Sequence, residues 1–156
     1  MRILMISLDK KIFDKKSAVA MRMVEYGKEN ELFIIVPHKQ KTRLELSSTV
    51  HVETSGGWSK KAQFFRIKRL GLKLIKQNNI EEITTQDPFF TGLVGWLLKR
   101  KFKLKLEVQM HGDFFSVQGG SALGGGGYYR RQYLKLFLPK FILKRADVIR
   151  VVGERV

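Results

Sequence analysis

The stretch "RILMISLDKKIFDKKSAVAMRMVEYGKENELFIIVP" (Arg2–Pro37) contains two short apolar runs separated by a helical pattern. The runs Arg2–Leu8 and Glu31–Pro37 are almost continuously apolar, which is typical of strands buried on both faces of a parallel sheet. The segment Ser17–Lys28 between them predicts a helix. Because parallel strands joined through a helix make a right-handed crossover, this stretch predicts the start of a doubly wound α/β sheet.

The rest of the chain repeats this alternation. Only the link between the second and third strands lacks a helix, because "HKQKTRLELSS" (His38–Ser48) is basic and predicts an irregular, exposed segment. We expect a single α/β domain with a mostly parallel, Rossmann-like sheet of about six strands and helices on both faces. The further strands are expected at Val50–Thr54, Glu81–Gln86, Lys103–Met110 and Asp147–Gly153, and the further helices at Ser59–Asn78, Phe89–Lys101 and Tyr128–Arg145.

The composition is that of an ordinary globular protein, with 44% hydrophobic and 11% aromatic residues, which excludes a disordered chain. At 156 residues the chain is long enough for one domain with a sizeable core. The absence of cysteine excludes disulfides and thiolate zinc sites. The N-terminal apolar run is too short for a secretory signal, and no stretch approaches the roughly 18 apolar residues of a membrane span. We therefore expect a cytoplasmic location.

The chain is strongly basic, since 30 Lys and Arg residues against 14 Asp and Glu give a net charge of +16. Such a field attracts nucleic acids, anionic membranes and phosphorylated substrates, and charge alone does not choose among them. In the helical segment Ser59–Asn78, four basic residues fall on the face opposite the apolar positions. This basic stripe is either a solvated outer surface or a contact surface for anions. Its residues are Arg66, Arg69, Lys73 and Lys76.

The segment "GGSALGGGG" (Gly119–Gly127) has the composition of a flexible linker. It is either a natural mobile lid or an engineered substitute for a longer loop, and it lacks the signature of a phosphate-binding P-loop. The helical pattern that follows, Tyr128–Arg145, contains Pro139, which predicts a kink or a break. Its apolar residues are expected to pack on the sheet or to lie partly on a membrane surface.

The expected strands end in polar residues and glycines, and ligands of an open parallel sheet bind outside the carboxyl ends of its strands. The stretch "KLKLEVQMHGDFF" (Lys103–Phe115) places His111 at such an end, where a neutral imidazole can accept a hydroxyl proton or hydrogen-bond a sugar. Gly112 would let the backbone approach a ligand closely, and Asp113 could orient the ring or bind hydroxyls. A purely structural histidine is the alternative. The other expected strand ends are Ser7–Asp9, His38, Ser55–Gly57 and Gln86–Asp87.

The sequence "TTQDPFFTGLVGWLLKR" (Thr84–Arg100) predicts a strand end followed by a helix that begins near Pro88. This segment is either a capped helix that packs on the sheet or part of a ligand site. For the pair Gly56–Gly57, after the third expected strand, a plain turn is the favoured interpretation. The residues of the helix that allow close approach of neighbouring backbone are Thr91, Gly92 and Gly95.

Several motifs of other enzyme classes are missing from the sequence. The first strand is not followed by G-x-G-x-x-G, so a dinucleotide cofactor is disfavoured. The three histidines, His38, His51 and His111, are not at metal-ligand spacing, and we predict no metal site. No G-x-S-x-G occurs, so a serine hydrolase has no support.

Taken in order, several stretches resemble one family. They are "RILMIS", a loop with "SAVAMRMVEYGKE", then "ITTQDPFFTGLVGWLLKR", "LEVQMHGD" and "ILKRADVIRVVGERV". Together they are similar to the N-terminal half of a GT-B glycosyltransferase of the large retaining family 4, also called group 1, and the similarity covers nearly the whole chain. In that family two Rossmann-like domains face each other across a cleft. The N-terminal domain mainly holds the acceptor, and the C-terminal domain binds the nucleotide-sugar donor.

The resemblance implies roles for individual residues. His111 matches the family histidine that lies in the cleft near the transferred sugar, so it is the implied catalytic residue. Asp87 matches a position that lines the acceptor side. The first loop corresponds to a donor-facing loop that often carries glycines in the family, and here it has none. The implied acceptor-binding residues are Asp87, Gln86, Thr91, Gly112 and Asp113, and the implied donor-facing residues are Asp9, Lys10 and Ser17.

The implied function is the acceptor-binding half of an enzyme of carbohydrate biosynthesis, which transfers a sugar from a nucleotide-sugar to a glycan or lipid-linked acceptor. The donor would be bound mainly by a C-terminal domain, so this chain is expected to hold no cofactor and to be inactive alone. Lys99, Arg100 and Lys101, with the basic stripe, are the implied contacts to an anionic inner membrane face. A nucleic-acid-binding domain is an alternative, although no known motif supports it. A non-catalytic subunit of a two-chain transferase is another.

Overall fold

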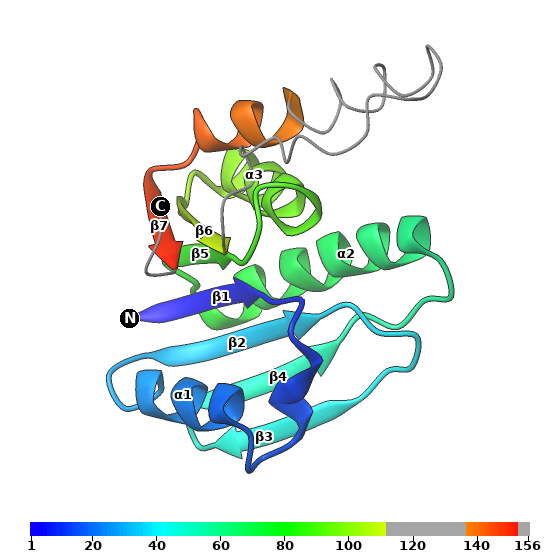
Figure 1. Cartoon of the computed structure of the whole chain (residues 1–156), viewed down its shortest axis with the longest axis vertical. Helices are drawn as coiled ribbons and strands as arrows, with labels where there is room; N and C mark the ends of the chain where they lie inside the picture. The colour runs from blue at the N-terminus through cyan, green and yellow to red at the C-terminus, as the bar shows by residue number, and fades with distance from the viewer. Residues whose placement is uncertain (112–136, 153–156) are drawn as a thin grey trace, which may run out of the picture.

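The computed structural model describes residues 1–111 and 137–152, which form a seven-stranded sheet with helices on both faces (Figure 1). The strand order is β3-β4-β2-β1-β5-β6-β7, and each neighbouring pair is parallel except β3 and β4. The strands are β1 (Arg2–Ile6), β2 (Glu31–Val36), β3 (Arg43–Ser47), β4 (Val50–Thr54), β5 (Glu82–Thr85), β6 (Lys105–His111) and β7 (Val148–Val152). The helices are α1 (Ala18–Tyr26), α2 (Lys60–Asn78), α3 (Phe90–Phe102), the short 3-10 helix η1 (Lys10–Phe13) and a helix at residues 137–143.

Alternation along β1 divides the core into two clusters. Leu4 and Ile6 join a cluster with the apolar residues of α2, α3 and the helix at 137–143. Met5 joins a second cluster, on the other face, with residues of η1 and α1. Strands covered on both faces explain the almost continuous apolar runs in the sequence. The expected doubly wound sheet is therefore confirmed, and its six expected strands correspond to β1, β2, β4, β5, β6 and β7.

The expectation of an irregular segment between β2 and β4 is wrong in part, because Arg43–Ser47 forms the edge strand β3. This strand pairs antiparallel with β4, and the register shifts between Glu45 and Ser47. Leu44 and Leu46 pack against the cluster on the α1 face, whereas Arg43 and Glu45 are exposed. The period of two in "RLELS" is the signal of a half-covered edge strand, and the basic flanking residues obscure it.

Polar caps fix where the helices begin. The Ser17 hydroxyl accepts a hydrogen bond from the Ala20 amide at the start of α1, and Ser59 does the same for Ala62 at the start of α2. Of the expected helix Tyr128–Arg145, the structure describes the part at residues 137–143. The glycine-rich segment Gly119–Gly127 lies outside the described residues.

Candidate functional site

The chain reverses its direction of winding between β1 and β5. The two strands are parallel neighbours, but the chain leaves β1 towards β2 on one side and leaves β5 towards β6 on the other. Ligands of doubly wound sheets bind at such a switch point, beyond the carboxyl ends of the strands. Ser7 and Gln86 are the first residues after β1 and β5. The candidate site is therefore centred on these two residues.

Hydrogen bonds join the segments that follow β1 and β5 at this switch point. The Ser7 hydroxyl, almost fully buried, donates to Gln86 Oε1 at 2.9 Å, and the Leu8 amide donates to the same oxygen at 2.8 Å. Ser7 Oγ also accepts from the Asp9 amide at 3.1 Å. The half-buried Gln86 side chain is thus fixed by the two hydrogen bonds that its Oε1 atom accepts beside the switch point.

The Asp87 carboxylate accepts hydrogen bonds from the start of α3, although the N-cap residue of this helix is Phe89. Asp87 is only 7% exposed, and its two oxygens accept from the Phe89 amide at 2.6 Å and the Thr91 amide at 3.4 Å. The fully buried Thr91 hydroxyl lies 2.8 Å from Oδ2 of Asp87 and accepts from the Asp87 amide at 3.1 Å. A carboxylate at a helix N-terminus is stabilised by these amides and by the helix dipole. The pair therefore positions the loop that carries Gln86.

The implied donor-facing loop is held by its own polar side chains. Asp9 accepts from the Lys11 amide at 2.9 Å and so caps η1, and Ser17 caps α1 while donating to the Lys11 carbonyl at 2.7 Å. The side chains of Asp9 and Ser17 thus form hydrogen bonds within the loop itself. Lys10 is exposed to solvent.

His111 is the last residue of β6, and its backbone pairs with Val152 of β7. Thr85 of β5 is level with Val108, so β6 extends about two residues, or roughly 7 Å, beyond the level of Gln86. His111 therefore belongs to the same sheet edge as Ser7 and Gln86, one strand further along. Gly112 and Asp113, the other residues expected there, lie outside the described residues.

Two glycines follow the end of β4 at the same edge. Gly56 and Gly57 have φ angles of 66° and 113°, a region that favours glycine, and the Gly57 amide donates to the Lys39 carbonyl at 2.9 Å. Ser55 Oγ donates to the Gly56 carbonyl at 2.9 Å and accepts from the His38 amide at 3.4 Å. These hydrogen bonds join the segment after β4 to the segment after β2.

The basic residues implied as anion contacts fall in two places. Arg66, Arg69 and Lys73 line a groove of about 570 Å³ between α2 and β4, whereas Lys76 is exposed and does not line it. The other group lies where α3 ends, at the opposite edge of the sheet. There Lys99 donates to Asp147 at 2.6 Å and to the Arg145 carbonyl at 2.7 Å, Arg100 lies 5.8 Å from the Trp96 ring, and Lys101 is exposed.

The ion pair of Lys99 and Asp147 gives a pH dependence of stability. Burial raises the pKa of Asp147. Hydrogen bonds from Lys99 and the Leu106 amide, with the charges of Lys99 and Lys105, together lower the pKa by more than burial raises it, so it lies below its usual 3.8. The stabilisation is therefore present above pH 3.8 and is lost as the pH falls through the folded-state pKa. Because Asp147 is partly exposed, we expect less than about 1 kcal/mol. Urea unfolding of Asp147→Asn should show this loss at pH 7, and a difference that persists at pH 2 would contradict it.

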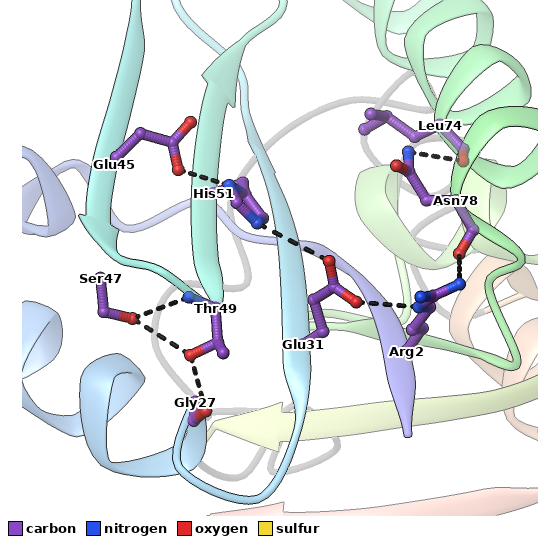
Figure 2. A network of polar contacts seen from close by, with 9 residues as sticks. All are labelled: Arg2, Gly27, Glu31, Glu45, Ser47, Thr49, His51, Leu74 and Asn78. Carbon is purple, nitrogen blue, oxygen red and sulfur yellow. Dashed lines mark hydrogen bonds and ion pairs between the residues drawn. The ribbon is translucent and has the colours of Figure 1, made fainter.

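The amino edge carries a polar network that the sequence did not reveal (Figure 2). His51 of β4 lies between Glu45 of β3, hydrogen-bonded to Nδ1, and Glu31 of β2, 3.8 Å from Nε2. Glu31 also accepts from Arg2 of β1 at 2.8 Å, and the His51 ring stacks on Phe33. The network ties four strands together at the edge opposite His111. Its only signal in the sequence is the alternation along β3.

Two further searches concern only the part of the chain that the structure describes. In residues 1–111 and 137–152, no helix is long and apolar enough to cross a bilayer. Within the same two ranges, no group of three His, Asp or Glu side chains is arranged to hold a metal ion.

Comparison with known proteins gives matches among solved structures. No protein-family model matches the sequence, and no curated protein matches it. Sucrose-phosphate synthase from Thermosynechococcus elongatus superposes with a TM-score of 0.68 at 15% identity, over 96% of this chain and 41% of that one. UDP-GlcNAc 2-epimerase from Methanocaldococcus jannaschii gives a TM-score of 0.56 at 14% identity, over 99% and 40%. Apo UGT2 from Phytolacca americana gives 0.55 at 11% identity, over 96% and 45%.

These likenesses bear on the fold. At identities of 11–15% they establish a common architecture, and the chain spans about two-fifths of the length of the first two structures. The matched proteins are a synthase, an epimerase and a UGT, and the second is named for UDP-GlcNAc. The chain therefore has the fold of one half of a GT-B protein, the fold to which the sequence resemblance points.

Proposed function

We propose that this chain is the acceptor-binding half of a glycosyltransferase of carbohydrate biosynthesis, which moves a sugar from a nucleotide-sugar to a glycan or lipid-linked acceptor. The observation that carries the proposal is the placement of Ser7, Gln86 and His111 along one carboxyl edge, beside the switch point of the sheet. The likeness of nearly the whole chain to part of a sucrose-phosphate synthase supports it.

The proposed roles follow the chemistry of each residue. His111 would hydrogen-bond the acceptor or transferred sugar, or accept a proton from a hydroxyl. Gln86 would contact acceptor hydroxyls, and the same role is proposed for Gly112 and Asp113, which follow His111 in the sequence. Asp87 and Thr91 would act through Gln86, since their polar atoms bond each other and the start of α3.

The donor is proposed to be held mainly by a second domain, either on the same polypeptide or as the separate subunit of a two-chain transferase. Transfer needs both substrates oriented together, and this orientation contributes a large part of the rate. Within this chain, Asp9, Lys10 and Ser17 form the loop that would face the donor. Lys10 is the proposed charged contact, because the side chains of Asp9 and Ser17 cap helices.

We expect the 156-residue chain alone to transfer no sugar from UDP-glucose or UDP-GlcNAc above the buffer blank. In a titration of ¹⁵N-labelled chain with glycan acceptors, the amide signals of Ser7, Gln86 and His111 should shift together. Signals of the amino-edge network at Glu31 and His51 serve as the internal control. Sugar transfer by the chain alone would contradict the two-domain proposal, and acceptor shifts confined to the amino edge would contradict the site.

A nucleic-acid-binding module is the second candidate, favoured by the net charge of +16. Adding a short oligonucleotide to the same sample distinguishes the two. Binding that weakens steeply with salt, with no response to sugars, would replace the glycosyltransferase proposal.

The basic surface is also proposed to bring the protein to an anionic membrane, as suits a lipid-linked acceptor. Beside the start of α2, Trp58 is 84% and Phe65 66% exposed, and aromatic side chains next to cations favour the membrane interface. The proposed cationic contacts are Arg66, Arg69, Lys73, Lys76, Arg100 and Lys101. Lys99 is a weaker proposed contact, because it is only partly exposed and already pairs with Asp147. We expect the chain to float with anionic vesicles and not with neutral ones, and equal recovery with both would reject charge-driven attraction to an anionic membrane.

A further inference from the structure

The groove between α2 and β4 gathers positive charge. Its volume is about 570 Å³, within the size range of small-molecule sites. Four of its lining side chains are basic, and one is a carboxylate. The lining residues are Lys41, Glu53, Thr54, Ser55, Arg66, Arg69, Leu70 and Lys73.

The single carboxylate does not balance these cations. Glu53 lies 3.2 Å from Arg43 of β3, so its charge is already compensated outside the groove. Among the described residues, the four basic side chains of the groove have no carboxylate within ion-pair distance. The groove therefore holds an excess of positive charge that an anion would compensate.

Two separate segments bring these cations together. A Cβ atom on Gly56 would lie 2.9 Å from Cγ of Lys41 and 3.0 Å from Nη1 of Arg66, so both side chains close over this glycine. Arg66, Arg69 and Lys73 stand three and four residues apart on α2 and line the same side. The cations thus converge from the β2–β3 connection and from α2.

The hydroxyl groups at the end of β4 already donate hydrogen bonds to backbone carbonyls, so an anion in the groove would be bound mainly by the cationic side chains. Thr54 Oγ1 donates to the Gln40 carbonyl at 2.7 Å, and Ser55 Oγ donates to the Gly56 carbonyl. Guanidinium groups match phosphate oxygens with paired hydrogen bonds, and an ammonium adds charge. We propose that this basic groove binds the phosphate or diphosphate group of a phosphorylated ligand.

The position of the groove separates it from the reacting end of the candidate site. Four strand spacings of about 4.8 Å, or roughly 19 Å, lie between β4 and the strand of His111. A phosphate bound in the groove would thus be remote from a sugar at His111. If the proposed function holds, on which this step rests, the acceptor carries its phosphate far from the hydroxyl that receives the sugar, and the remote contact helps to orient it.

Calorimetric titration of the full chain with inorganic pyrophosphate, at constant ionic strength, tests the groove. We expect Arg66→Gln/Arg69→Gln/Lys73→Gln to weaken binding at least about tenfold. The control Lys60→Gln/Lys61→Gln/Lys68→Gln removes the same charge from positions of the same helix outside the groove, and should weaken it less than about twofold. Equal losses in both variants would overturn the proposal, because they would indicate only a diffuse field.

Vesicles distinguish a free phosphate from a lipid headgroup. If phosphatidylglycerol vesicles bind the chain, the groove variant binds less than the control variant, and pyrophosphate competes, then the phosphate belongs to a lipid. If pyrophosphate binds with the same dependence on the groove and vesicles do not, the ligand is soluble. Either result supports the groove, and binding of neither probe overturns it. The assay requires no sugar transfer, so its failure is separate from a failure of the proposed function.

Discussion

Replacing Asp87 by alanine is expected to destabilise the chain by about 2–3 kcal/mol. The change removes the carboxylate that accepts from the Phe89 and Thr91 amides at the start of α3, and side-chain bonds of this kind typically contribute about 1 kcal/mol. It also takes an acceptor from the Thr91 amide and hydroxyl in a site where Asp87 is only 7% exposed, and a buried polar group that loses its partner costs about 1–3 kcal/mol. Urea unfolding followed by circular dichroism measures the loss.

Two controls separate capping from charge. Asp87→Asn keeps one acceptor oxygen and should lose only about 1 kcal/mol, which is the typical worth of the charge at a helix N-terminus. In a double-mutant cycle, Asp87→Ala and Thr91→Val should cost less together than the sum of their separate costs, because the two side chains share a 2.8 Å contact. A stability of Asp87→Ala equal to or above that of the parent would contradict the cap, and would favour a carboxylate kept for a ligand.

The sequence predicted the strands that are covered on both faces. In Arg2–Ile6 and Glu31–Val36 the side chains on both faces of the strand are largely apolar, because helices cover both faces. The resulting continuous apolar run indicates a buried strand. Strand β3 was missed because it alternates leucines with exposed polar residues and has basic flanking residues. This segment becomes a strand because it pairs with β4, and that pairing cannot be read from the local sequence.

The edge that carries the candidate site could be predicted, because the carboxyl ends of parallel strands meet at one edge. The contacts within it could not. Ser7 and Gln86 are 79 residues apart, and their hydrogen bond exists only because β1 and β5 are neighbours. In contrast, Asp87 and Thr91 are four residues apart at a helix start, so their capping is a local property.

The basic groove combines both kinds of signal. The stripe on α2 follows from helical periodicity, and the sequence left open whether it faces solvent or an anion. Lys41 was not singled out, because it comes from the connection between β2 and β3 and meets Arg66 of the stripe beside Gly56 only in the folded chain. Lys76 lies outside the groove although it follows Lys73 on the same helix face. Helical periodicity gives the face on which a residue lies and does not show where along that face the groove ends.

Replacing Gly95 by valine is expected to destabilise the chain by about 3 kcal/mol, and replacing it by alanine by up to about 2 kcal/mol. A Cβ atom at Gly95 would lie 2.5 Å from Cγ2 of Thr85 and 3.0 Å from Cδ1 of Leu106, both fully buried. Helix propensity favours alanine over glycine by about 1 kcal/mol, but overpacking a close-packed core costs about 1–3 kcal/mol, so the contact outweighs the propensity. The same unfolding measurement tests both variants.

Two comparisons decide whether the contact with β5 is the cause. Thr85→Ser removes the Cγ2 methyl, so in the Gly95→Ala background it should recover about 1 kcal/mol, whereas alone it should destabilise. Gly71→Ala on α2 places its Cβ 2.6 Å from Cδ1 of Leu98, the end of a flexible side chain that can rotate away. That variant should keep the parental stability or gain from helix propensity. If Gly71→Ala and Gly95→Ala lose equal stability, then the close packing of α3 on Thr85 is not what requires a glycine at position 95.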